Sequence, residues 1–344
     1  MALVEKRSRS PTGDAGALIE KKKPKSDALS IGAVPRTSTM QSPIMVLTGH
    51  GGEVLSFQFD PSGKFCASAG HDKDIFLWEV HGECENYGLL HGHKQAVLQL
   101  GWSFDSCNIW SCSADKSVMF WDAEVCKRVK NFKGHSSFVN CVATTRKGQN
   151  LGVSGSDDGD IKLWDPRVRS AVQTLPESYQ VTAVEFSADG SQVFAGGLEN
   201  EIKIWDLRKE EVSLTLKGHT DTLTGLRLAP DGNLLLSNSM DNTLRVWDTR
   251  AFVEGNRCRV VMGGHMHNFE KNLLRCSWAP DGSKVAAASA DKMVYIWQAD
   301  TGKVVYKLPG HNGSVNAVDF HPLEPIIGSA SSDKKVFLGE IDPA

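Results

Sequence analysis

Histidine, serine and aspartate, the three side chains of a catalytic triad, recur along this 344-residue sequence at nearly constant spacing. Each histidine follows a glycine, and an acidic residue lies about 22 residues later. A serine stands four residues before that acid, and a tryptophan stands six residues after it. The four complete sets are His50, Ser68, Asp72 and Trp78; His93, Ser111, Asp115 and Trp121; His135, Ser154, Asp158 and Trp164; and His219, Ser237, Asp241 and Trp247.

These sets could catalyse acyl transfer only if the acid oriented a histidine that activates the serine. The arrangement occurs four times, however, whereas one active site would suffice. The sequence also contains no G-x-x-x-x-G-K-[ST] phosphate loop, no H-E-x-x-H zinc motif and no G-x-S-x-G nucleophile elbow. We therefore expect no enzymatic activity, no metal site and no cofactor.

The sets belong to an internal repeat. The tryptophans are spaced by 43, 43, 41, 42 and 50 residues, and a seventh unit carries Gly339 in the tryptophan position. Short alternating runs such as residues 54–59 are followed by turn signals such as Asp60-Pro61-Ser62-Gly63, in which proline and glycine suit tight turns. Seven units of short strands predict an all-β repeat protein. The Gly-His pairs end at His50, His93, His135, His219, His265 and His311.

Seven copies of this Gly-His and Trp-Asp pattern resemble the WD40 repeat. The resemblance implies a seven-bladed β-propeller over residues 41–344, in which each blade is a four-stranded antiparallel sheet. It also implies that each set forms a buried structural network, from histidine to acid to serine to the tryptophan indole. Removing one member should leave a buried partner unsatisfied, at a cost of about 1–3 kcal/mol.

Two units depart from the pattern in ways that affect the network. The fourth has Pro176-Glu177 in place of Gly-His, with Ala195 and Glu199 in the serine and aspartate positions. We expect this unit to lack the network. The seventh lacks tryptophan, so its histidine and acid have no indole to join.

The sixth unit is longer than the others. Ala287 replaces its serine, and either His265 or His267 could supply its imidazole. About four extra residues lie in 251–259, on the expected bottom face, and about four more lie in 266–272, on the top face. The second segment contains Phe269 and Lys271, which we interpret as part of a partner-specific loop.

The last unit lacks its outermost strand after Ile341. Residues 43–47, directly before the first Gly-His pair, form an apolar run of suitable length. We expect this segment to pair with residues 335–339, because the pairing would remove two exposed sheet edges and close the ring.

Partner-binding residues are expected on the top face, where this family places its Gly-His loops and acidic turns. Phe138, Tyr179, Leu198 and Met240 lie in these loops. Large apolar groups on a rim often mark an interface. Packing of the loops against neighbouring blades is the alternative interpretation.

Charge is distributed unevenly along the chain. Residues 1–40 carry eight basic and four acidic side chains, a net charge of +4, which leaves −7 on the remainder. A folded part that acidic is a poor general binder of nucleic acid. The first 40 residues lack apolar periodicity, so we expect a disordered basic tail. Its segment Lys21, Lys22, Lys23, Pro24 and Lys25 resembles a nuclear localisation signal.

Several stretches narrow the resemblance to the WD-repeat subunits of the U5 small nuclear ribonucleoprotein of the spliceosome. That resemblance implies a nuclear, non-catalytic scaffold in pre-mRNA splicing, acting as a monomer inside a larger complex. Its partners would be large spliceosomal proteins of the pre-mRNA-processing factor 8 type, in the U5 particle and the tri-snRNP, with at most local RNA contact. The matching stretches are residues 42–45, 83–87, 155–159, 267–278, 308–311 and 329–334.

A second function remains open. The W-D-x-R boxes that end at Arg167, Arg208 and Arg250 resemble those of substrate receptors for cullin–RING ubiquitin ligases, in which the aspartate and arginine contact the adaptor. In the structural alternative, each arginine covers the indole or pairs with a carboxylate. Direct RNA binding is disfavoured by the charge of the folded part and by the lack of a basic stripe with stacking aromatics.

Overall fold

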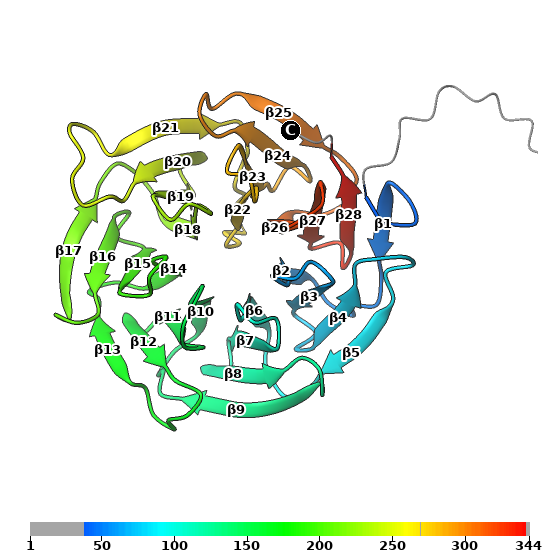
Figure 1. The fold of residues 1–344 in the computed structure, drawn as a ribbon, viewed down its shortest axis with the longest axis horizontal. Coiled ribbons are helices and arrows are strands. Elements are labelled where there is room, and N and C mark those ends of the chain that lie inside the picture. Colours follow the sequence, from blue (N-terminus) through cyan, green and yellow to red (C-terminus); the bar gives the residue numbers. More distant parts are fainter. Residues whose placement is uncertain (1–37, 269, 342–344) are drawn as a thin grey trace, which may run out of the picture. The chain divides into compact units, whose positions relative to one another are not determined.

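The computed structural model describes residues 38–268 and 270–341. This part of the chain contains 28 strands, in seven four-stranded antiparallel sheets, and no helix. Figure 1 shows the sheets as blades arranged in a ring, each with one strand near the centre of the ring and one at its circumference. The prediction of an all-β, seven-bladed propeller is confirmed. Since the described residues form no helix, none of them makes a helical membrane span.

The blades follow one another in chain order, and each is described from its inner to its outer strand. Blades one to four consist of β2 (Val54–Phe59), β3 (Phe65–Gly70), β4 (Ile75–Glu79) and β5 (Asn86–Leu90); β6 (Val97–Trp102), β7 (Asn108–Ser113), β8 (Ser117–Asp122) and β9 (Lys127–Lys133); β10 (Val139–Thr144), β11 (Gly152–Ser156), β12 (Asp160–Trp164) and β13 (Gln173–Pro176); and β14 (Val181–Phe186), β15 (Gln192–Gly197), β16 (Ile202–Asp206) and β17 (Glu211–Leu216). Blades five to seven consist of β18 (Leu223–Leu228), β19 (Leu234–Ser239), β20 (Thr243–Asp248) and β21 (Cys258–Gly263); β22 (Cys276–Trp278), β23 (Lys284–Ala288), β24 (Val294–Gln298) and β25 (Val304–Leu308); and β26 (Val315–Phe320), β27 (Ile326–Ser331), β28 (Val336–Glu340) and β1 (Ile44–Leu47).

The hydrophobic core lies between adjacent blades. Every residue of β14 is buried, although alternate side chains of a strand point to opposite faces. Ala183 and Phe194 of blade four pack in one cluster with Leu226 and Trp247 of blade five. Each blade therefore completes its core with side chains of its neighbour, which is why seven short sheets form one ring.

The two ends of the described chain meet in blade seven. β1 is antiparallel to β28, with Ile44 opposite Gly339 and Leu47 opposite Val336. Leu47 is buried in a cluster that also contains Val336 and Phe57 of blade one. The segment before the first Gly-His pair thus supplies the outer strand of the last blade, as Figure 1 shows at the junction of blue and red strands.

The described part of the chain begins beside blade one. Met40 is buried in the same cluster as Leu47 and forms a β-bridge with Gly82. Thr39 donates a hydrogen bond to Glu324 at 2.9 Å. The rest of the expected tail, residues 1–37, lies outside the described residues, as do the basic residues Lys21, Lys22, Lys23 and Lys25.

A buried arginine ties the inner ends of four blades together. Arg275, just before β22, donates hydrogen bonds to the carbonyls of Asn140 (2.7 Å), Thr224 (2.8 Å) and Thr182 (3.2 Å). These acceptors belong to blades three, five and four. Burial lowers the pKa of Arg275, and three carbonyl dipoles offset part of the cost of holding its charge away from water. The sequence analysis did not single out this residue.

We predict that deleting residues 1–47 destabilises the propeller. The deletion removes β1, uncovers the edge of β28 and takes Leu47 out of its cluster. The thermal unfolding temperature should fall by more than about 5 °C, because a loss of several kcal/mol shifts a domain of this size by a few degrees per kcal/mol. Deletion of residues 1–37 is the matched control and should leave the unfolding temperature unchanged. Equal unfolding temperatures for the two truncations would contradict the role given to β1.

Candidate protein-binding surface

In blade one, the predicted set of four side chains forms a chain of hydrogen bonds. His50 Nδ1 lies 2.6 Å from Asp72 Oδ2, and His50 Nε2 lies 2.7 Å from Ser68 Oγ. The Trp78 indole N–H donates to the same Ser68 oxygen at 2.8 Å. The histidine therefore stands between the acid and the serine, whereas the expected order placed the acid in the middle. A neutral imidazole that donates from Nδ1 and accepts at Nε2 fits this arrangement.

The other three complete sets have the same connectivity. The distances from histidine Nδ1 to the carboxylate are 3.0 Å for His93, 3.0 Å for His135 and 2.9 Å for His219. In each set, one serine hydroxyl contacts both the imidazole and the indole at 2.7–2.8 Å. The local connectivity of acid, histidine and serine is the same as in a hydrolase triad.

Burial separates these networks from a hydrolase site. All four serines are fully buried, so no substrate carbonyl can reach their oxygens. Each oxygen also accepts the indole N–H, which would have to be displaced before attack. The hydrogen bonds of these networks hold strands together, and the serine oxygens are not available for nucleophilic attack.

Hydrogen bonds within the four networks hold the pKa of Asp72, Asp115, Asp158 and Asp241 below its usual range. Burial alone would raise the pKa of Asp115, but hydrogen bonds from His93, Ser117 and the backbone N–H of Lys94 hold it well below its usual range. Burial lowers the pKa of the His135 imidazole. In blade three, where the pKa of Asp158 is also lowered, an ionised carboxylate thus faces a neutral imidazole near pH 7.

Blade four contains a different network, where none was expected. Glu177 Oε1 accepts the indole N–H of Trp205 at 2.7 Å. Its other oxygen, Oε2, lies 2.7 Å from Lys203 Nζ, which also contacts Glu199 at 2.5 Å. The Pro176-Glu177 pair therefore keeps the indole satisfied without histidine or serine. A glutamate at the Gly-His position, with a lysine two residues before the tryptophan, is the sequence signal for it.

Blade six uses His265 rather than His267. His265 is buried, its ring packs edge-on against Trp297 at 5.5 Å, and its Nε2 lies 2.8 Å from Asn238 Oδ1. Among the residues that the structure describes, neither ring nitrogen of His267 has a hydrogen-bond partner. The acid of this blade, Asp291, accepts instead from the Tyr295 hydroxyl at 2.6 Å.

Blade seven keeps the histidine, acid and serine but replaces the indole. His311 lies 3.0 Å from Asp333 and 2.9 Å from Ser329. The ring of Phe337 packs edge-on against His311, with 4.5 Å between ring centroids. Phe337 stands two residues before Gly339, as Phe76 stands two residues before Trp78, and the ring of Phe76 likewise packs against its histidine, His50.

Three of the predicted partner-binding residues gather on the top face of blades three and four. Here the top face is the one that carries the Gly-His loops and the acidic turns. Phe138, Tyr179 and Leu198 are 46%, 54% and 44% exposed. Tyr179 and Leu198 line a hollow of about 300 Å³ together with Asp157, whose backbone N–H donates to Phe138 O at 2.9 Å. Exposed aromatic and aliphatic groups around a hollow are typical of a protein-binding surface.

The remaining predicted residues are not brought to this hollow. Met240 is half-buried in the acidic turn of blade five, and its backbone N–H donates to Thr222 O at 2.9 Å. Lys271 is exposed in the long loop before β22, with a positive φ of 53°. Phe269 lies outside the described residues.

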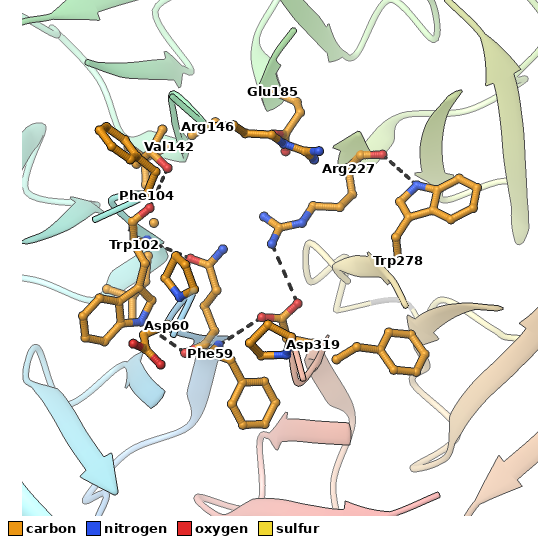
Figure 2. A pocket seen from close by; sticks show the side chains of 18 of the residues that line it. Phe59, Asp60, Trp102, Phe104, Val142, Arg146, Glu185, Arg227, Trp278 and Asp319 are labelled. Carbon is orange, nitrogen blue, oxygen red and sulfur yellow. Dashed lines mark hydrogen bonds and ion pairs between the residues drawn. The ribbon is translucent and has the colours of Figure 1, made fainter. Parts of the chain in front are cut away.

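The structure also shows exposed or inward-facing residues that the sequence analysis did not select. Phe252, in the insertion before β21, is 98% exposed on the bottom face, opposite the top face. Glu185, Arg227 and Asp319 line a cavity at the bottom of the central channel (Figure 2). Each is the one charged residue of its inner strand, and this contrast is the signal that could have revealed them.

The W-D-x-R boxes adopt local ion pairs in two of three cases. Arg167 Nη2 lies 2.6 Å from Asp165, and Arg250 Nη2 lies 2.5 Å from Asp248. In the third box, the backbone N–H of Arg208 donates to Asp206 at 2.9 Å. The arginine side chains of the first two boxes therefore contact their own aspartates, as in the structural alternative. Adaptor binding stays a prediction.

Comparison with known families supports the repeat assignment. The model of the WD domain, G-beta repeat, matches residues 41–79, 256–298 and 302–338. The model of the nucleolar protein 10-like N-terminal domain, a β-propeller, matches residues 94–272. The chain belongs to the WD40-repeat family of β-propeller proteins.

Within the WD40-repeat family, this chain is most informatively compared with splicing proteins. It is 53% identical to the U5 small nuclear ribonucleoprotein 40 kDa protein of Mus musculus, over 89% of this chain and 86% of the relative. It is 47% identical to the protein of the same name from Dictyostelium discoideum, over 90% and 87%. It is 45% identical to the pre-mRNA-splicing factor cwf17 of Schizosaccharomyces pombe, over 98% and 100%. The predicted resemblance to this group is confirmed.

We predict that Asp115→Asn changes the pH dependence of stability. The folded-state pKa of Asp115 is depressed, so its contribution is complete above the unfolded pKa of about 4 and is lost as pH falls below it. The variant should be about 1–3 kcal/mol less stable at pH 7, with a smaller difference near pH 3. Urea unfolding of both proteins at several pH values measures this. The exposed variant Glu124→Gln is the control, and a difference that does not narrow in acid would contradict the prediction.

We also predict that Glu177 and Trp205 are energetically coupled. Glu177→Ala leaves the indole N–H without its acceptor and should cost about 1–3 kcal/mol in unfolding free energy. The same substitution should cost less in a Trp205→Phe background, because no indole remains to be satisfied. Denaturant unfolding of the single and double variants gives the coupling energy. Equal costs in the two backgrounds would disprove the assignment.

Proposed function

We propose that this chain is a non-catalytic scaffold subunit of the U5 small nuclear ribonucleoprotein and the spliceosome. The observation that carries the proposal is its identity of 45–53% with proteins named for that particle and for pre-mRNA splicing, over most of both chains. Its partners would be large spliceosomal proteins of the pre-mRNA-processing factor 8 type. A ring of seven blades offers broad surfaces on which such proteins can assemble.

The chemistry of the described residues supports binding rather than catalysis. The four serines of the complete networks are buried and already hydrogen-bonded to imidazole and indole. A scaffold needs these networks intact, because they keep the loops of the top face in place.

A nuclear location follows from the proposed role. Splicing takes place in the nucleus, and the basic segment around Lys22 would act as a signal for import of the chain into the nucleus. All eight cysteines are free thiols, as is typical of a reducing compartment.

We place the protein-binding surface at the hollow between blades three and four on the top face. Tyr179 and Leu198 line it, Phe138 is joined to it by the backbone hydrogen bond from Asp157, and aromatic groups often carry most of the binding energy of an interface. Asp157 and Asp158 also line the hollow. A partner segment with an apolar residue next to a basic one would complement both features.

We predict that Tyr179→Ala weakens binding to pre-mRNA-processing factor 8. Truncation of a central aromatic should raise the dissociation constant at least about tenfold. The measurement is surface plasmon resonance with the purified partner, supported by pull-down from nuclear extract with and without nuclease. Phe252→Ala is the matched control, because it removes an exposed aromatic ring from the opposite face.

Two outcomes would overturn parts of the proposal. If Tyr179→Ala and Phe252→Ala bind equally well, the binding surface lies elsewhere on the propeller. If the wild-type pull-down contains cullin and its adaptor but no splicing proteins, the scaffold role is wrong and the W-D-x-R boxes carry the function.

A further inference from the structure

The hollow of about 300 Å³ on the top face has an uneven charge. Asp157 and Asp158 are among the described residues that line it, and none of these residues is lysine or arginine. The other lining residues are Gly159, Ser178, Tyr179, Gln180 and Leu198. The hollow therefore combines two carboxyl groups with an exposed aromatic ring and contains no basic side chain to balance them.

Asp157 is held in place by a buried amide. Asn140, on β10, is buried, and its side-chain NH₂ donates to Asp157 Oδ1 at 2.6 Å and to Val181 O at 3.0 Å. Val181 begins β14, so this amide joins the acidic turn of blade three to the inner strand of blade four. The carboxyl group is thus oriented before a partner arrives, which lowers the entropy that binding must cost.

The second oxygen of Asp157 is available to a partner. Within residues 38–268 and 270–341, Asp157 Oδ2 accepts no hydrogen bond and forms no ion pair. Asp157 is half-buried, so its carboxyl group still reaches the surface. An ionised carboxylate can accept about four hydrogen bonds, and a donor can therefore bind Oδ2 while Asn140 stays on Oδ1.

Asp158 adds negative charge without a free oxygen. Its Oδ2 accepts from the backbone N–H of Ser136 at 2.8 Å and lies 3.0 Å from His135 Nδ1, and its Oδ1 accepts from the backbone N–H of Asp160 at 3.0 Å. Burial alone would raise the pKa of Asp158, but these hydrogen bonds lower it. Burial lowers the pKa of His135, so no imidazolium neutralises Asp158 near pH 7.

A neighbouring recess on blade four extends the acidic surface. It shares Tyr179 with the hollow and is lined by three carboxylates, those of Glu177, Glu199 and Glu201. Lys203 Nζ lies 2.7 Å from Glu177 and 2.5 Å from Glu199, and Lys217 Nζ lies 2.9 Å from Glu201. Three carboxylates face two ammonium groups, so negative charge is in excess here as well.

The apolar groups of the hollow suit a long side chain with a charged end. Tyr179 and Leu198 are both exposed. A cation over the face of a tyrosine ring is attracted by the negative side of the ring. Lysine and arginine also carry aliphatic stems that pack on apolar surface while their charged ends stay outside it. An aromatic ring, an aliphatic side chain and a free carboxylate oxygen together match such a side chain.

We propose that the hollow receives a lysine or arginine side chain from the protein partner and that Asp157 selects it. The charged end donates to Asp157 Oδ2 and lies over the ring of Tyr179, while the stem packs on Leu198. The inference rests on the proposed function, since it concerns the same surface, and it adds the residue that decides the charge of the partner. RNA does not fit this site, because its phosphates would face carboxylates.

The first test uses the full chain with ¹³C-labelled leucine methyl groups and the capped peptide acetyl-Gly-Arg-Gly-amide, with lysine, glutamine and glutamate counterparts. The Leu198 methyl signals, assigned from the Leu198→Ile variant, are followed by nuclear magnetic resonance during titration. The arginine and lysine peptides should reach saturation at a concentration at least about tenfold lower than the glutamine peptide, because charge-assisted hydrogen bonds are stronger than neutral ones. The glutamate peptide should bind more weakly still.

Variants separate Asp157 from the overall charge of the top face. Asp157→Asn keeps an oxygen that can accept from Asn140, and it should abolish the preference for basic peptides over the glutamine peptide. Asp221→Asn is the matched control, because it removes the same charge from an exposed residue of the top face of blade five, outside the hollow. Thermal unfolding checks that both variants are folded.

Three results of the peptide titrations would overturn the inference. The glutamine peptide could bind the wild-type chain as tightly as the arginine peptide, which decides the matter even if Asp157→Asn unfolds. The Asp157→Asn variant could keep the full preference for basic peptides. Oligouridylate could shift the Leu198 signals at a lower concentration than the arginine peptide.

Binding to purified pre-mRNA-processing factor 8 distinguishes this inference from the proposed function. Asp157→Asn should raise the dissociation constant at least about tenfold, and Asp221→Asn should leave it unchanged. If the factor does not bind the wild-type chain but the basic peptides keep their preference, the proposed partner is wrong and the inference stands. If Tyr179→Ala weakens binding of the factor but Asp157→Asn does not, the surface is right and selection by Asp157 is wrong.

Discussion

No blade of this propeller can bury both of its faces alone, so the whole structure depends on closure of the ring. β14 is buried along its full length because blades on either side cover it. The inner strands of all the blades can be covered on both sides in this way only if blade seven is complete. The antiparallel pairing of β1 with β28 provides that completion by joining the two ends of the described chain. Closure also removes the free edges that would otherwise template association with another chain.

A second constraint is that the indole N–H of the repeat tryptophan finds an acceptor, and the blades meet it in different ways; Trp110, which stands outside the repeat position, has no acceptor among the described residues. Ser68 serves Trp78 in blade one, and Glu177 serves Trp205 in blade four. In blade six, Trp297 donates to the carbonyl of Gly263 at 3.2 Å. The repeat therefore preserves hydrogen-bond satisfaction rather than residue identity, because an unpaired buried donor costs more than a change of partner.

The same polar groups explain why a triad-like connectivity is compatible with a scaffold. The acid, histidine and serine side chains already make hydrogen bonds between strands, so they are not free to contact partners. Two other kinds of surface are available. One is the hollow on the top face that is lined by Tyr179 and Leu198. The other is the bottom cavity, where Arg227 lies 3.8 Å from Asp319.

We could predict the number of blades, the membership of the four complete networks and the WD40 family from the sequence alone. The reason is that the same residue types recur in the same order with a period near 42 residues. Only the tertiary structure decided that the imidazole stands between acid and serine, that Glu177 replaces the network of blade four, and that His265 rather than His267 is buried against Trp297. The sequence pattern also did not predict that Glu185, Arg227 and Asp319 line one cavity, since each appears once in its own strand. They meet because the ring brings inner strands that are far apart in sequence to one channel. A local sequence pattern does not show which distant strands become neighbours.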